Sequence, residues 1–271
     1  MGSTTAVKAA RPLRRFLAAP AGDAISCLSA TVADSAQPWT GLLCLLLSVM
    51  AAWWIYVPAH EFLHAAACSL SGGEVRKLTI SPIYGGVLLS HWLTFVQPGG
   101  EYAGRLSDFS TGHSDLRYLA IDAAPYLLSI VLGVPLLRLA TLRRSRLLAG
   151  PALVLALVPF LSLTGDYYEM GSIVVTRAVL PFDQPPEPWE TPGGLMKLRS
   201  DDLPSLIGRM VHDGARFAGD VPGGAVGAGA FVAISFGLGL VLALMTYAAG
   251  GMMSGWFLSP RGSEHAAVLD A

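Results

Sequence analysis

The stretch WWIYVPAHEFLHAAACSL (residues 53–70) carries an H-E-x-x-H motif inside one of the most apolar regions of the chain. On a helix, residues four apart lie on one face with Cβ atoms about 5–6 Å apart, so His60 and His64 can bind the same metal ion. Glu61 then projects beside that ion, where its carboxylate can take a proton from bound water. The alternative is a pair of helix histidines satisfied by backbone or core partners. The sequence around the motif favours the metal site.

The composition of the chain is typical of a membrane protein. Of its 271 residues, 53% are hydrophobic and only 14% are charged, whereas soluble domains carry about 25% charged residues. The formal net charge of −1 gives no indication of nucleic-acid binding. The three cysteines have no paired or metal-type spacing, so we expect buried thiols and no disulfide framework; they are Cys27, Cys44 and Cys68.

Four apolar stretches are long enough to cross the hydrocarbon layer as helices, which takes about 20 residues. They cover residues 39–70, 118–137, 147–180 and 225–258. Residues 75–95 are rich in β-branched and aromatic side chains and are broken at Tyr84-Gly85-Gly86, which is typical of a β-hairpin, and residues 98–116 have the composition of a polar loop. The predicted fold class is a mainly α, multi-pass membrane protein, with about four transmembrane helices and a small β-hairpin after the metal-binding helix.

This pattern divides the chain into five segments. We expect a cytoplasmic or interfacial N-terminal segment over residues 1–38 and a membrane core of three spans plus the hairpin over 39–180. An extramembrane loop follows over 181–224, with a short amphipathic helix at 203–217. The fourth transmembrane helix covers 225–258, and a disordered tail covers 259–271.

The placement of Lys and Arg predicts the orientation of the spans. One basic group lies in the N-terminal segment, and the other lies between the second and third spans at Arg138, Arg143, Arg144 and Arg146. The positive-inside rule puts both groups in the cytoplasm. With an even number of spans, both termini are then cytoplasmic, and we expect the protein in the cell membrane.

A catalytic zinc site has three protein ligands, so a third residue must join the histidines. The third apolar stretch is interrupted by Gly165-Asp166-Tyr167-Tyr168-Glu169, and a carboxylate at membrane depth costs about 2.5–3.5 kcal/mol on insertion scales. Asp166 and His60 both lie about 30 Å along their spans, so they can meet at similar depth. Asp166 is therefore the predicted third ligand. Glu169, on the same helix face, is the alternative ligand or a hydrogen-bond partner of one; both carboxylates face water if the span ends near residue 163.

Two further residues have open alternatives. Asp122, near the start of the second span, either orients a ligand imidazole through its free ring nitrogen, or caps the helix, or lies at the membrane interface. His91, in the predicted hairpin, either stabilises a developing oxyanion or lies on the strand surface. No role is assigned to the remaining histidines, which are His113, His212 and His265.

The arrangement resembles the site-2 protease family of intramembrane zinc metalloproteases. Those proteins carry H-E-x-x-H on one transmembrane helix, a ligand aspartate on a later one, and β-structure just after the metal helix. The matching residues here are His60, Glu61 and His64, then the strand region at 73–95, then Asp166. Asp122-Ala123-Ala124-Pro125 is similar to the family's small-residue-plus-proline element. The resemblance covers residues 39–176.

The chain departs from the family pattern around the aspartate. In the family this residue is commonly followed by glycine, within a run that contains an upstream asparagine and proline. Here Gly165 precedes Asp166, Tyr167 follows it, and Pro159 stands without the asparagine. The chain is therefore similar to a divergent, minimal member, and the departures concern the third ligand and substrate handling.

The resemblance implies a zinc metalloendopeptidase that cuts a membrane protein or peptide substrate in or near a transmembrane segment. Zn²⁺ lowers the pKa of bound water toward about 7 and polarises the scissile carbonyl, while Glu61 passes the water proton to the leaving amine. The hairpin offers a strand edge to an extended substrate. The alternatives are a non-catalytic metal-binding membrane partner or chaperone and a proton or metal-ion transporter. The partners implied are a substrate and the lipid bilayer; the oligomeric state stays open.

Overall fold

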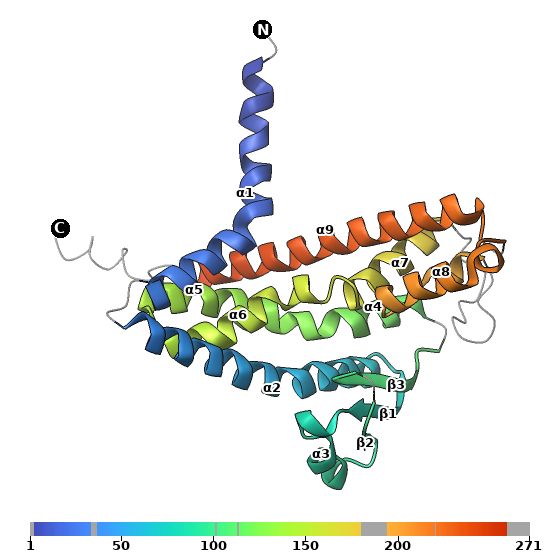
Figure 1. Ribbon diagram of the computed structural model, residues 1–271, viewed down its shortest axis with the longest axis horizontal. Coiled ribbons are helices and arrows are strands. Elements are labelled where there is room, and N and C mark those ends of the chain that lie inside the picture. Colours follow the sequence, from blue (N-terminus) through green and yellow to red (C-terminus); the bar gives the residue numbers. More distant parts are fainter. Residues whose placement is uncertain are drawn as a thin grey trace, which may run out of the picture. The chain divides into compact units, whose positions relative to one another are not determined.

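The computed structural model describes residues 3–33, 37–100, 102–112, 114–179, 194–219 and 221–258. Over these residues the chain is mainly helical, with one small β-sheet (Figure 1). Four helical stretches in this part of the chain are long and apolar enough to cross a membrane: Pro38–Leu70, Asp115–Arg143, Arg146–Val179 and Gly224–Leu258. The predicted fold class is confirmed: this is a mainly α, multi-pass membrane fold.

The chain divides into two compact units. The first comprises residues 1–50, 128–157 and 246–271, and the second comprises residues 51–127 and 158–245. In the first unit, Asp23 of α1 (Ser3–Leu28) accepts a hydrogen bond from Tyr247 and forms an ion pair with Arg138. Every residue of the candidate site belongs to the second unit.

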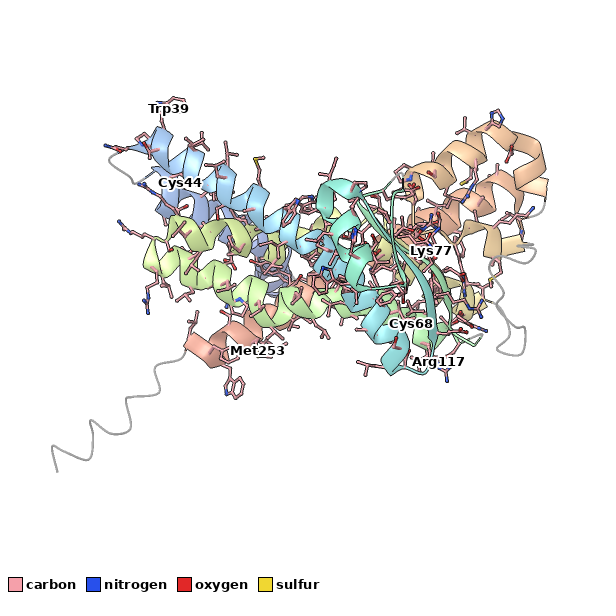
Figure 2. The ribbon with its side chains drawn as sticks, turned by 90° about the horizontal axis from the view of Figure 1, so that it is seen from below. Trp39, Cys44, Cys68, Lys77, Arg117 and Met253 are labelled. Atoms are coloured by element: carbon pink, nitrogen blue, oxygen red, sulfur yellow. The ribbon has the colours of Figure 1, made fainter. Side chains whose placement is uncertain are left out.

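The helix α2 (Pro38–Leu70) carries the H-E-x-x-H motif and runs through Pro58 as one helix. Only 17% of its most apolar window is buried inside the molecule, so most of its apolar side chains are available to lipid. Trp39, at the start of the helix, is 81% exposed (Figure 2). The three cysteines are free; Cys27 and Cys68 are buried as expected, whereas Cys44 is only half-buried.

The second and third spans are both interrupted. The second consists of α4 (Asp115–Ala123), a 3₁₀ turn at Ala124–Tyr126, a π-helical turn at Ser129–Gly133 and α5 (Val134–Arg143). Pro125 has no backbone N–H, which interrupts the α-helical hydrogen bonds there. The third consists of α6 (Arg146–Leu161) and α7 (Asp166–Val179). The predicted break therefore falls just before Asp166, which begins α7.

The sheet contains β1 (Glu74–Ile80), β2 (Val96–Pro98) and β3 (Gly104–Ser110) in the order β2-β1-β3. β1 is parallel to β2 and antiparallel to β3. The predicted β-hairpin over residues 75–95 is therefore wrong. A 3₁₀ turn at Pro82–Tyr84 and the helix α3 (Gly86–Trp92) follow β1. The antiparallel partner β3 lies within residues 98–116, where the sequence predicts a loop.

The spacing of apolar residues explains this difference. Leu89 and Leu93 both pack against the buried cluster that contains Leu78, Ile80 and Val96, and residues four apart share one helix face. Gly85 ends the preceding turn with φ of 84°, a conformation that glycine adopts without strain. The Tyr84-Gly85-Gly86 signal thus marks a turn into a helix and not a turn between two strands.

Residues 194–219 pack against two helices of the second unit. A 3₁₀ turn at Gly194–Leu198 leads to α8 (Leu203–Gly219), at the position of the predicted amphipathic helix. Leu198 and Leu206 share a buried cluster with Tyr168 of α7 and Phe231 of α9 (Gly224–Leu258). Residues 181–193 of the predicted loop and the predicted tail at 259–271 lie outside the described residues.

Candidate metal centre

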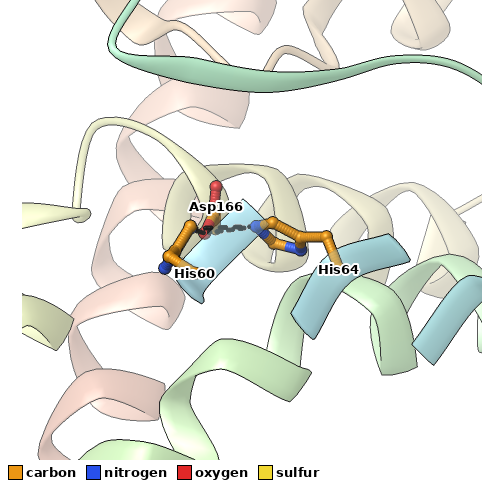
Figure 3. Close-up of side chains that lie close together, drawn as sticks. All are labelled: His60, His64 and Asp166. Atoms are coloured by element: carbon orange, nitrogen blue, oxygen red, sulfur yellow. Dashed lines mark hydrogen bonds and ion pairs between the residues drawn. The ribbon is translucent and has the colours of Figure 1, made fainter. Parts of the chain in front are cut away.

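Two histidines of α2 and the first residue of α7 meet inside the second unit (Figure 3). The Nε2 atoms of His60 and His64 are 3.0 Å apart. Asp166 Oδ2 lies 3.2 Å from Nε2 of His60 and 3.5 Å from Nε2 of His64. Within the described ranges, this is the one group of three His, Cys, Asp or Glu side chains whose ligand atoms converge in this way. The group can hold a metal ion.

The separations of the three ligand atoms fit a tetrahedral metal site. Bonds of about 2.0–2.2 Å to zinc at tetrahedral angles place neighbouring ligand atoms about 3.3–3.6 Å apart. The separations of 3.0, 3.2 and 3.5 Å are close to that range. Two imidazole nitrogens and one carboxylate oxygen are also donors that zinc prefers. Both the chemistry and the spacing therefore suit a divalent transition-metal ion.

The ring orientation of each histidine is held by a partner at its other nitrogen. His64 Nδ1 lies 2.8 Å from the carbonyl oxygen of Ile121, and a carbonyl only accepts, so the Nδ1–H must donate. This tautomer leaves the lone pair of Nε2 for a metal. His60 Nδ1 forms a hydrogen bond with the hydroxyl group of Tyr56, one helical turn earlier. Both imidazoles are thus presented through Nε2.

Asp166 is held by a residue that sequence reasoning missed. The hydroxyl group of Tyr126 donates a hydrogen bond of 2.7 Å to Asp166 Oδ2, and Tyr126 is only 2% exposed. Asp166 also begins α7, where the helix N-terminus favours a negative charge. No spacing rule links residues 126 and 166, although Tyr126 directly follows the small-residue-plus-proline element. Tyr56 was predictable, because it stands four residues before His60 on the same helix.

Glu61 lies against β3 and faces the same cavity as His64 and Asp166. It is 8% exposed, and its carboxylate lies beside the backbone of Leu106. A Cβ atom at Gly104 would stand 2.4 Å from Glu61 Cγ. Glycine at this position therefore lets the strand approach the carboxylate closely.

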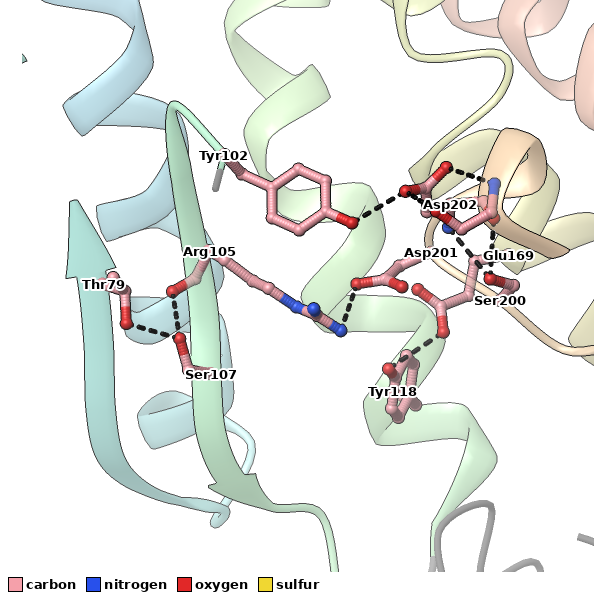
Figure 4. Close-up of polar contacts among 10 residues, drawn as sticks. Thr79, Tyr102, Arg105, Ser107, Tyr118, Glu169, Ser200, Asp201 and Asp202 are labelled. Atoms are coloured by element: carbon pink, nitrogen blue, oxygen red, sulfur yellow. Dashed lines mark hydrogen bonds and ion pairs between the residues drawn. The ribbon is translucent and has the colours of Figure 1, made fainter. Parts of the chain in front are cut away.

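Glu169 stands away from the histidine pair. Its Oε1 accepts a hydrogen bond of 3.0 Å from the Tyr118 hydroxyl group (Figure 4), and it is absent from the converging group. Asp166 is thus the carboxylate that the fold brings to the histidines. Glu169 instead lines the cavity beside them.

Asp122 also lines this cavity and is 5% exposed. The carbonyl group that His64 contacts belongs to its neighbour, Ile121. Asp122 Oδ2 is buried and has no hydrogen-bond partner. None of the roles expected from the sequence, which are orienting an imidazole, capping a helix and lying at the membrane interface, accounts for that oxygen.

The other histidines that the structure describes do not belong to the converging group. His91 is on α3 and not on a strand, and its Nδ1 bonds to the carbonyl oxygen of Val87 in the same helix. His212 is exposed on α8. His113 and His265 lie outside the described residues.

The cavity has a volume of about 130 Å³, and residues of β3 and of the segments just before β3 and α8 form part of its lining. The Tyr102 hydroxyl group donates to Asp202 Oδ2 at 2.7 Å, and Arg105 pairs with Asp201 at 2.8 Å (Figure 4). The hydrogen bond to Asp202 raises the pKa of Tyr102. Burial alone would raise the pKa of Asp202, but hydrogen bonds from Ser205 and Tyr102 outweigh it, so that pKa lies below its ordinary value.

Comparisons of this chain with protein-family models, with curated proteins and with solved structures find no match.

Proposed function

We propose that this protein is an intramembrane zinc metalloendopeptidase, which hydrolyses a peptide bond in or near a transmembrane segment of a membrane protein substrate. One observation carries the proposal. The ligand atoms of His60, His64 and Asp166 converge, and the carboxylate of Glu61 lines the cavity that opens beside them. A purely structural zinc site has no need of that additional carboxylate. Helices long enough to cross a membrane carry all four residues.

The residues of the site have separate tasks in this reaction. When bound, Zn²⁺ would supply Lewis acidity toward the scissile carbonyl and toward water. Glu61 accepts a proton from water at its carboxylate and delivers it to the leaving amide nitrogen. The Tyr126 hydroxyl group and the Ile121 carbonyl group keep Asp166 and His64 in position.

Strand β3 supports the binding of an extended substrate. In the order β2-β1-β3 of the described strands it is an edge strand that pairs with β1, so its other edge has no strand partner. Gly104, Arg105 and Leu106 of this strand line the cavity. A substrate helix that unwinds locally can pair with this edge and bring its backbone carbonyl groups to the site. In this proposal, β3 takes the role of the substrate-pairing edge that the sequence assigned to the hairpin.

The charge distribution supports a location in the cell membrane with both termini in the cytoplasm. The alternatives, a non-catalytic metal-binding partner or chaperone and an ion transporter, do not explain why Glu61 faces the cavity. A C-terminal fusion to alkaline phosphatase, which is active only after export, tests the orientation: we expect an inactive fusion. An active fusion would contradict a cytoplasmic C-terminus.

The decisive test compares wild-type protein with Glu61→Gln in proteoliposomes. We expect both proteins to contain about one zinc ion per chain, because Glu61 is not among the converging ligand atoms. Cleavage of a panel of fluorogenic transmembrane peptides should be lost only in the variant. Asp108→Asn is the matched control, because Asp108 is an exposed carboxylate on β3. Equal cleavage by wild type and Glu61→Gln would refute the mechanism.

A further inference from the structure

The cavity beside the converging ligands has a second wall that the proposed hydrolysis does not use. Asp122 of α4, Glu169 of α7 and Asp201, which lies just before α8, line it with three carboxylates. Figure 4 shows Glu169 and Asp201 facing each other across a small space, with Arg105 reaching in from β3. We call these three residues the acidic wall.

Asp122 is the member that points to a missing ligand. Its side chain lines the cavity, and the residue is 95% buried, since its relative exposure is 5%. Its Oδ2 has no hydrogen-bond partner. Buried polar atoms are nearly always paired, and an unpaired buried carboxylate is especially unfavourable. A buried acceptor without a partner, on a residue that lines a cavity, fits a site that receives a donor from outside the chain.

The other two carboxylates supply little compensation. Glu169 is paired with the neutral hydroxyl group of Tyr118. Asp201 is paired with Arg105, in the one ion pair found on this wall within the described residues. Among the described residues, Arg105 is thus the one cationic side chain that an ion pair joins to this group of three carboxyl groups. The acidic wall offers hydrogen-bond acceptors to a cationic group.

The dispersion of the carboxylates indicates what kind of cation fits. A compact metal ion needs ligand atoms that converge within a few ångströms, at bond lengths of about 2.0–2.6 Å. Among the described residues only His60, His64 and Asp166 converge so closely, and the acidic wall does not form such a group. An ammonium or guanidinium group on a flexible stem can contact acceptors that lie apart. Arg105 of this chain already makes such a contact at Asp201.

We propose that the acidic wall is a substrate subsite, in which Asp122 and Glu169 bind the side chain of a lysine or arginine close to the scissile bond. This inference rests on the proposed peptidase function and names its substrate class, membrane peptides with a basic residue near the cleaved bond. A substrate paired with β3 would present alternate side chains to the cavity, because Gly104, Arg105 and Leu106 run along its edge. Asp201 receives the basic group at the rim, where Arg105 now stands.

A binding experiment tests the subsite without relying on cleavage. Two blocked heptapeptides, identical except for a central lysine or norleucine, are titrated onto zinc-loaded Glu61→Gln protein in detergent. We expect the lysine peptide to bind about tenfold more tightly or better, as a charged hydrogen bond would provide. Asp122→Asn in the same background should remove the difference, and Asp108→Asn should preserve it. Equal binding of the two peptides would overturn the proposal.

A second variant and a zinc titration complete the test. If Asp122→Asn does not yield folded, zinc-containing protein, Glu169→Gln takes its place, and an unchanged lysine preference in that variant also overturns the subsite. Zinc titration tests whether the acidic wall binds a metal ion instead. A second bound zinc ion that is lost in Asp122→Asn would show a metal site there and refute the proposal.

Cleavage by wild-type protein separates this inference from the proposed function. Cut sites in a defined peptide mixture are mapped by mass spectrometry. A fixed basic position near the cut bond supports the subsite, whereas cleavage without that preference refutes the subsite and leaves the peptidase standing. A lysine preference in binding together with no cleavage by wild-type protein refutes the peptidase and leaves the cation site standing.

Discussion

The two walls of the cavity differ in how their polar groups are satisfied. On the metal side, the ligand atoms of His60, His64 and Asp166 lie 3.0–3.5 Å apart, and each residue has a further partner. On the acidic wall, one buried oxygen of Asp122 has no partner. Converging ligand atoms are preorganised for a compact ion, whereas dispersed carboxylates leave charge for a larger cation. Substitutions on the first wall should therefore change metal content, and those on the second should change substrate choice.

The largest expected effect is on zinc affinity, when the two carboxylates of α7 are each replaced by alanine and compared. Asp166→Ala should lower zinc affinity more than the roughly 10–100-fold seen when only a partner of a ligand is removed. Glu169→Ala should keep zinc, because Glu169 hydrogen bonds to Tyr118 and not to the histidines. Elemental analysis and competition with a chelator measure both. If Glu169→Ala loses zinc and Asp166→Ala retains it, Glu169 and not Asp166 is the third ligand.

Gly104→Val should break catalysis while sparing the metal. Any Cβ atom at this position meets Glu61 Cγ at 2.4 Å, so the carboxylate must move, and a displacement of about 1 Å can cost about 100-fold in rate. The zinc content should stay unchanged, because the three atoms nearest to that Cβ position all belong to Glu61 and none to a metal ligand. Asp108→Val, at an exposed position of the same strand, controls for β-branching. Unchanged cleavage by Gly104→Val would show that Glu61 does not need its present position.

Tyr126→Phe should weaken the metal side more gently. The ring still packs against Tyr167, with 4.4 Å between the ring centroids, while the hydrogen bond to Asp166 is lost. We expect zinc affinity to fall by about 10–100-fold. Tyr118→Phe is the matched control, because it removes a hydroxyl group from Glu169 instead. If both variants lose zinc affinity equally, Tyr126 has no particular role in holding Asp166.

The metal side could largely be predicted from the sequence, whereas of the acidic wall only Asp122 and Glu169 stand out there and Asp201 does not. His60, Glu61 and His64 are close in sequence, so helix geometry alone places them together. Asp166 was predicted from its depth along a second span. That argument is coarse, because it takes no account of the break between α6 and α7. Asp201 and Arg105, in contrast, meet through the register of β3 and the path of residues 199–202, neither of which follows a period. The hairpin prediction failed for a related reason. The spacing of Leu89 and Leu93 is compatible with a strand after a turn and with a helix, and their packing against the cluster that contains Leu78 selects the helix.

The smallest expected effect lies at the rim of the acidic wall, where Asp202 caps α8. Its side chain accepts hydrogen bonds from the backbone N–H and the hydroxyl group of Ser205, and Asp202→Ala should cost about 1 kcal/mol of stability. Asp202→Asn should retain most of this stability, because asparagine also caps helices well. Thermal unfolding in detergent measures both, and equal destabilisation by the two substitutions would show that capping is not the cause.

The pH dependence of the stability that Asp202 contributes tests the same residue in a second way. The pKa of Asp202 is lowered in the folded protein, so the stability it contributes is fully present above the ordinary aspartate pKa of about 3.9. That contribution should disappear as the pH falls below about 4 and through the lowered pKa. Wild-type protein should therefore lose its advantage over Asp202→Ala in this range. If wild-type protein stays more stable than Asp202→Ala well below the ordinary pKa, the negative charge of Asp202 does not contribute to stability. Its hydrogen bond with Tyr102 would then stabilise the fold without that charge.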